Sequence, residues 1–250
     1  KPAIDYKKDY LKINKENIYV FIVLVIFAVT LFMYASGSFA YPYFEDDDPW
    51  AHALGTKFVS VEKTVFTDGF DARYLDPYPP GYDLLMGILH QTSSSIMWTL
   101  KFFNSLILAL GIIFFYFFAK IFTRSRQKAL ISTFVLASLP SFMTHFIWAH
   151  SLVIILFFPA MYCLEMIRKD KRWMYPGMLL IASILFVQPS QAMKLGVMFG
   201  LYWIVKSLYE RKIAWKHLTT LVGGLLLSLF WWGSRASVYI GAGRIERKIA

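Results

Sequence analysis

The chain has 250 residues, of which 57% are hydrophobic and only 17% are charged. Soluble domains carry about a quarter charged residues, and several apolar runs here approach the roughly 20 residues that span a bilayer. The composition therefore predicts an all-α polytopic membrane protein. The net charge of +10 does not indicate a partner nucleic acid, because the basic residues fall in short clusters between apolar runs. The single cysteine, Cys163, excludes a disulfide framework and a thiolate metal site.

Residues 1–17 contain five lysines and are expected to form a cytoplasmic N-terminal segment. An uninterrupted apolar stretch over residues 18–39 is the first expected membrane span and serves as a signal anchor. The expected membrane module covers residues 18–235 and contains seven spans. The six later spans are expected at about 96–118, 129–146, 151–166, 174–187, from a turn at 188–191 to about 205, and at 218–232.

This topology keeps the N-terminus in the cytoplasm of a multi-pass protein of the cell membrane. It places 17 of the 26 Lys and Arg residues on the cytoplasmic side, as the positive-inside rule requires. Residues 236–250 then lie outside and end in a basic run, which is typical of the start of a further segment. We therefore expect the sequence to be a fragment of a longer protein.

Residues 40–95 form the first outer loop, in which acidic residues predominate. A helix is expected to begin at Pro49 and to lie on the membrane surface as far as about Val65. A turn rich in proline follows at residues 76–82, and it is rigid because each proline fixes its own φ and restricts its predecessor. Residues 82–91 are apolar on one side but too short to span, which predicts an interfacial or re-entrant helix.

Four consecutive carboxylates stand at the exit of the first span, in the sequence FEDDDPWAH. Such charge is costly there, because like charges repel and low dielectric raises the penalty. A Mg or Mn ion would relieve both costs, so Asp46, Asp47 and Asp48 are candidate ligands or catalytic acids. His52 follows Asp48 by four residues and can meet it on one helix face. The alternative is that Asp48 caps a helix with Pro49 at its first position while the other acids are solvated.

The other outer turns supply further candidates. His145 and His150, in the sequence THFIWAH, can join a metal site near the carboxylates or can simply be interfacial aromatic residues. Lys194 lies slightly within the sixth expected span, where an ionisable group is a functional candidate. Lys194 and Arg235 are candidates for binding a lipid-linked phosphate, although Lys194 can also snorkel to the surface.

A span that ends in an Asp before Pro-Trp, a His four residues after that Asp, and a later Tyr-Pro-Pro-Gly segment together resemble the GT-C superfamily of glycosyltransferases. The resemblance is greatest to archaeal relatives of the oligosaccharyltransferase catalytic subunit, and its motifs fall at residues 45–52 and 76–82. It implies a seven-span module with surface helices in the first outer loop. It also implies that Asp48 is the first metal-binding and catalytic acid, and that His150 belongs to a second motif at the fourth span.

The sequence departs from the family's pattern at three places. Trp148 stands where the second motif often has an Asp, and Ala53 follows His52 where an Arg is often found near the first motif. The Trp-Trp-Asp-type acceptor motif of oligosaccharyltransferases is absent from these residues. The chain is therefore expected to contain the donor-binding and metal-binding half.

The resemblance implies a glycosyltransferase that moves a sugar or oligosaccharide from a polyprenyl-phosphate donor to a protein or lipid-linked acceptor at the outer membrane face. The alternatives are a monosaccharide transferase that uses a polyprenyl-monophosphate sugar, and a noncatalytic scaffold or transporter subunit. The expected catalytic acids are Asp48 and Asp47, the expected ligands of Mg or Mn are Asp48, Asp46, His150 and His52, and the expected phosphate-binding residues are Lys194 and Arg235.

Overall fold

The computed structural model describes residues 17–67, 74–139, 142 and 146–249. Within these ranges the chain is helical and contains no strand, so the all-α class expected from composition is confirmed. The elements in chain order are α1 (Asn17–Phe39), α2 (Asp47–Glu62), α3 (Gly81–His90), α4 (Ile96–Thr123), α5 (Arg126–Ser138), α6 (Ala149–Met166), the 3-10 helix η1 (Lys171–Trp173), α7 (Met174–Val187), α8 (Pro189–Tyr209) and α9 (Trp215–Ile249).

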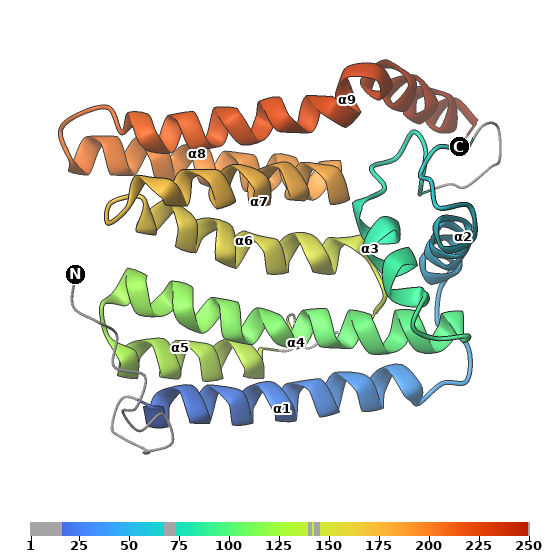
Figure 1. The fold of residues 1–250 in the computed structure, drawn as a ribbon, viewed down its shortest axis with the longest axis horizontal. Helices are drawn as coiled ribbons and strands as arrows, with labels where there is room; N and C mark the ends of the chain where they lie inside the picture. The colour runs from blue at the N-terminus through green and yellow to red at the C-terminus, as the bar shows by residue number, and fades with distance from the viewer. Residues whose placement is uncertain (1–16, 68–73, 140–141, 143–145, 250) are drawn as a thin grey trace, which may run out of the picture.

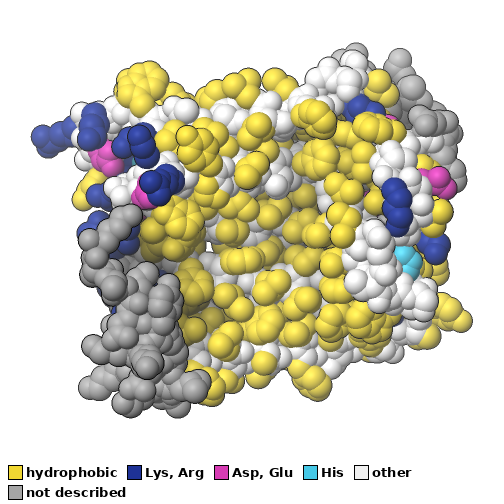
Figure 2. Space-filling view, in the orientation of Figure 1, with side chains coloured by type: hydrophobic (Ala, Val, Ile, Leu, Met, Phe, Trp, Pro, Cys, Tyr) yellow, Lys and Arg dark blue, Asp and Glu magenta, His cyan; other side chains and the backbone are white. Residues whose placement is uncertain are grey.

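Helices α1 and α4 to α9 run side by side as a bundle, and α2 and α3 lie at one end of it (Figure 1). Helix α4 packs between α1 and α6, and α7 packs between α6 and α9. Figure 2 shows the viewed face as a hydrophobic band with charged side chains at its two ends. Because exposed apolar surface of this extent belongs in lipid, the band corresponds to the membrane-embedded part of the bundle.

Four helices are long and apolar enough to cross a membrane, namely α1, α4, α6 and residues Trp215–Gly241 of α9. The protein is accordingly a multi-pass membrane protein. Helices α5 and α7 have only 13 and 14 residues, and α8 is not among the four although it has 21. Four of the seven expected spans therefore coincide with helices that are long and apolar enough to cross a membrane.

The third expected span, residues 129–146, is wrong as a single helix. Helix α5 ends at Ser138, and Leu139 has extended backbone with φ −77° and ψ 123°. The physical reason is in the sequence, because Leu139 precedes Pro140 and a residue before proline is driven out of the helical region. The remainder of the expected span, as far as it is described, is not helical until α6 begins at Ala149.

Non-helical backbone inside a membrane protein must be buried and have its polar groups paired. Two buried side chains supply such pairing before α6. The Tyr34 hydroxyl of α1 donates to the Phe142 carbonyl oxygen at 2.8 Å, and the Asn104 amide of α4 donates to the Phe146 carbonyl oxygen at 3.0 Å. Helices α1 and α4 thus stabilise the connection that leads into α6.

The bounds of α7, α8 and α9 agree only in part with those expected from the sequence. Helix α7 has the expected bounds, but the expected turn at 188–191 is wrong, because α8 begins at Pro189 with Gln188 as its N-cap. Proline is well suited to a first helical position, where its missing N–H costs no hydrogen bond. The helix that contains the last expected span continues beyond residue 232, since α9 extends to Ile249 and its final part changes direction (Figure 1).

We predict that Tyr34→Phe lowers the free energy of unfolding by about 1–3 kcal/mol, because it leaves the Phe142 carbonyl oxygen unpaired. Tyr116→Phe is the matched control, since the buried Tyr116 hydroxyl has no hydrogen-bond partner among the described residues. Thermal unfolding in detergent micelles measures both. Equal midpoints for the two variants would contradict the role assigned to Tyr34.

Candidate functional site

The acidic cluster forms the N-terminus of α2. Asp46 is the N-cap, with extended backbone, and its Oδ1 accepts the Asp47 N–H at 2.7 Å. The expectation that Asp48 caps the helix directly before a first-position Pro49 is therefore wrong by two residues. Proline is tolerated within the first turn because the N–H groups there have no intrahelical partner. Asp47 and Asp48 then lie in the first turn, where the helix dipole favours negative charge.

The segment between α1 and α2 is held against α4. Lys101 of α4 is only 4% exposed, and its Nζ donates to the Tyr41 carbonyl oxygen at 2.6 Å. Phe44 is buried, and its ring meets the Trp50 ring edge-on with centroids 4.9 Å apart. These contacts place the acidic start of α2 at the end of the bundle. There Asp46 and Asp47 are exposed and Asp48 is half-buried.

His52 does not turn toward Asp48 as its spacing predicts. Its Nδ1 lies 2.6 Å from Oδ1 of Asp83 in α3, and both side chains are almost completely buried. Burial raises the pKa of Asp83, because it penalises the charged carboxylate, and the nearby His52 opposes this shift. His52 and Asp83 therefore form a buried hydrogen-bonded pair that joins α2 to α3.

Close helix approach makes this pair possible. A Cβ added to Gly55 would lie 2.1 Å from Asp83 Oδ2, and one added to Gly87 would lie 2.6 Å from a methyl carbon of Val59. The two glycines, one on each helix, thus let α2 and α3 pack with little space between their backbones. Asp83 Oδ2 and the neighbouring Thr56 Oγ1 are buried without a hydrogen-bond partner among the described residues.

Tyr74 connects the buried pair to the acidic cluster. Its ring stacks on the His52 ring at 4.8 Å between centroids, and its hydroxyl donates to Asp48 Oδ1. Asp83, His52, Tyr74 and Asp48 consequently form a continuous chain of contacts from the core to the surface. The chain fixes one oxygen of Asp48 and leaves its other oxygen outside this hydrogen bond.

Tyr82 fastens the same site to the membrane bundle. Its ring lies against His52, with centroids 4.7 Å apart, and its hydroxyl donates to Asn104 Oδ1 at 3.1 Å. Burial raises the pKa of Tyr82 well above its ordinary value, so the hydroxyl stays a neutral donor. Asn104 therefore pairs with the site through its oxygen and with the Phe146 carbonyl through its nitrogen.

His150 lies at the start of α6 beside the first turn of α8. The Gln188 amide nitrogen is 3.3 Å from His150 Nε2 and can donate to it when that nitrogen is unprotonated. Asp48, His52 and Lys194 are the ionisable groups that act electrostatically on His150. Lys194 itself is exposed. Asp48 and Lys194 are thus within electrostatic range of His150, whereas His145 lies outside the described residues.

Arg235 is already engaged by the protein. Its Nε and Nη2 bind the two carboxylate oxygens of Asp76 at 3.0 and 3.3 Å, and both side chains are only 20% exposed. The guanidinium also lies over the Trp231 and Phe66 rings, at 4.1 and 4.8 Å from their centroids. Arg235 therefore ties α9 to the turn before α3, and only part of its donor set remains for a phosphate.

The expected metal ligands do not form a ready-made cage. Among the described residues, no group of three His, Cys, Asp or Glu side chains is placed to hold a metal ion. Of the expected ligands, His52 is bound to Asp83, and Asp48 accepts from Tyr74. Asp46 caps α2 and remains exposed.

Asp83 and Tyr74 are the site residues that sequence reasoning missed. One signal was present, since Asp83, Gly87 and His90 repeat at spacings of four and three within a short apolar helix, which puts polar and small residues on one face. Tyr74 carries no comparable signal. No protein-family model matches the chain, and no curated protein matches it in sequence.

We predict that Gly55→Ala destabilises the protein by about 1–3 kcal/mol, because the new methyl group would overlap Asp83. Gly200→Ala in α8 is the matched control. Its added Cβ would meet no atom within 4 Å, so a gain of up to about 1 kcal/mol in helix propensity is expected. Thermal unfolding compares the two, and a Gly55→Ala protein as stable as Gly200→Ala would refute the close packing.

The ionisation of Asp83 should also make the stability of the protein depend on pH. Because its pKa is raised in the folded protein, the folded state holds this proton more tightly than the unfolded state does. Its contribution is thus full below about pH 4, the ordinary value for Asp, and is lost as the pH rises through the raised pKa. Asp83→Asn removes this titration. We expect the melting temperature of the original protein, relative to Asp83→Asn, to fall as the pH is raised above about 4, whereas a constant difference would contradict the assignment.

Proposed function

We propose that this protein is a membrane glycosyltransferase of the GT-C type, which transfers a sugar or oligosaccharide from a polyprenyl-phosphate donor to a protein or lipid-linked acceptor. The proposed active site lies at the end of the bundle that carries α2 and α3, and the positive-inside rule supports the outer membrane face for this end. In the same proposal, α1 and α4 to α9 are the seven spans.

One observation carries this proposal above the others. Asp48 lies at the N-terminus of a surface helix and is held in one orientation by Tyr74, which stacks on the buried His52–Asp83 pair. A carboxylate that is held by a side chain resting on a buried pair is preorganised for chemistry, whereas a solvated helix cap needs no such support. Asp46 and Asp47 beside it are exposed, and the Asp46 side chain accepts a hydrogen bond from the backbone N–H of Asp47.

A magnesium or manganese ion fits this arrangement if the donor completes its coordination. Mg²⁺ is commonly bound by one or two carboxylates together with substrate phosphates and waters, and it does not require an all-protein cage. Asp48 would supply the principal ligand, with Asp46 and His150 as the further candidates. When bound, such an ion would neutralise charge on the leaving phosphate.

The remaining residues have distinct roles in the proposal. Lys194 is exposed, acts electrostatically on His150 and would attract the donor phosphate. Asp47, exposed in the first turn of α2, would polarise the acceptor nucleophile. His52 acts as a positioning residue rather than a metal ligand, because it is 4% exposed and bound to Asp83. Arg235 would support the site by tying α9 to Asp76.

We predict that Asp48→Asn lowers sugar transfer by at least about 100-fold, because the amide loses the charge that binds the metal or activates the reacting group. Transfer is measured with purified protein, Mg²⁺ and radiolabelled lipid-linked sugars, with monophosphate and diphosphate donors in separate reactions. The donor that supports transfer identifies the enzyme class.

Glu62→Gln is the control, since Glu62 is an exposed carboxylate at the other end of α2. Both variants are expected to insert and to unfold like the original protein. Full activity of Asp48→Asn would overturn the assignment of Asp48. If neither donor supports transfer by the unaltered protein, the scaffold or transporter alternative takes its place.

A further inference from the structure

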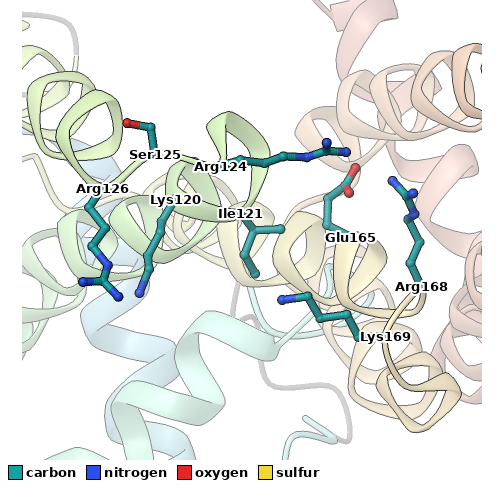
Figure 3. A pocket seen from close by; sticks show the side chains of 8 residues that line it. All are labelled: Lys120, Ile121, Arg124, Ser125, Arg126, Glu165, Arg168 and Lys169. Atoms are coloured by element: carbon teal, nitrogen blue, oxygen red, sulfur yellow. The ribbon is translucent and has the colours of Figure 1, made fainter. Parts of the chain in front are cut away.

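A basic cleft lies at the end of the bundle opposite the candidate active site. It is formed where α4 ends, α5 begins and α6 ends, and its volume is about 600 Å³. Figure 3 shows the side chains around it. The lining residues are Lys120, Ile121, Arg124, Ser125, Arg126, Glu165, Arg168 and Lys169.

The acidic residue in this lining, Glu165, is already neutralised from the neighbouring helix α8. Its Oε1 accepts the Tyr202 hydroxyl at 2.6 Å and lies 3.3 Å from Lys206 Nζ. Both members of this ion pair are largely buried, with side chains 13% and 9% exposed. Glu165 therefore supplies at most one negative charge against the five Lys and Arg side chains of the cleft, and it shares that charge with Lys206. Arg168 approaches a further carboxylate, Glu210, only loosely, at 4.0 Å.

Among the described residues, the helix termini contribute less negative charge than the cleft has cations. The C-terminus of a helix carries about half a negative charge, so α4 and α6 together supply about one. Five Lys and Arg side chains line the cleft. The start of α5 adds N–H groups and a positive helix end, and Ser125 caps it by accepting the Lys128 N–H at 3.3 Å. The cleft is thus prepared for an anion.

The backbone at Arg124 supports a role for its side chain. Arg124 ends α4 with a left-handed φ of 54°, a conformation in which glycine is usual and other residues are strained by about 1 kcal/mol or more. In Figure 3 the Arg124 and Arg168 side chains extend toward Glu165 from opposite sides. The Arg124 guanidinium therefore lies in the cleft, where it can bind an oxyanion through two N–H groups.

We propose that this cleft binds the phosphate head group of an anionic membrane lipid. A basic pocket between membrane helices is suited to such a head group. The last turns of α4 also expose Phe117 and Phe122, which are 38% and 62% accessible and can contact acyl chains. A soluble phosphate compound would use the guanidinium and ammonium groups but would gain nothing from this apolar surface.

The test measures binding of phosphatidylglycerol and phosphatidylcholine to the purified chain in detergent by native mass spectrometry. The original protein is expected to prefer phosphatidylglycerol. Each basic residue contributes about fivefold to anionic lipid binding, so Arg124→Gln with Lys169→Gln should weaken phosphatidylglycerol about 25-fold and leave phosphatidylcholine unchanged. Arg124→Lys keeps the charge and should retain most of the binding.

The matched control combines Lys128→Gln with Lys216→Gln, which removes two exposed cations at the same end of the bundle but outside the cleft. An equal loss in the control would show general surface attraction and overturn the proposal. If equimolar glycerol phosphate displaces phosphatidylglycerol, the cleft binds a soluble phosphate compound, and the proposal of a lipid is overturned. Thermal unfolding of each variant verifies the fold. If the double variant unfolds, Lys169→Gln alone replaces it, with an expected loss of about fivefold for phosphatidylglycerol.

Discussion

The buried contact between His52 and Asp83 is the constraint on which the candidate site depends. Burying two ionisable groups is costly unless they pair, and their 2.6 Å contact satisfies that requirement only if α2 and α3 approach closely. Gly55 permits the approach because any Cβ there would overlap the carboxylate. The same pair supports Tyr74, and Tyr74 orients Asp48. The close packing of α2 against α3 thereby determines the orientation of the Asp48 carboxylate.

Asn104 extends this constraint into the membrane bundle. Its oxygen accepts from Tyr82, which packs on His52, and its nitrogen donates to the Phe146 carbonyl in the non-helical connection before α6. An amide can satisfy both partners because it carries a donor and an acceptor on one side chain. The geometry of the site and the entry of α6, which carries His150, are consequently coupled through α4.

The two ends of the bundle have different chemistry. At one end, α2 presents consecutive carboxylates, and the cation Arg235 is held by Asp76. At the other end, the cleft between α4, α5 and α6 has several Lys and Arg side chains, and its Glu165 is held by Lys206. The acidic cluster and the basic cleft thus each carry an excess of one sign, and the ion pairs of Arg235 and Glu165 reduce the opposing charge nearby. The acidic end is suited to a cation and the basic end to an anion.

The sequence by itself determined the all-α class, the four long apolar helices, the bounds of α7 and the exposed acidic start of α2, because hydropathy, proline and capping act over a few residues. It also indicated Asp48 as a candidate site residue, but it did not predict that the Tyr74 hydroxyl would hold the Asp48 carboxylate. Only the tertiary structure decided the partners of His52 and Arg235, which lie 31 and 159 positions away in the chain. No local pattern encodes such pairs, since they depend on how helices pack.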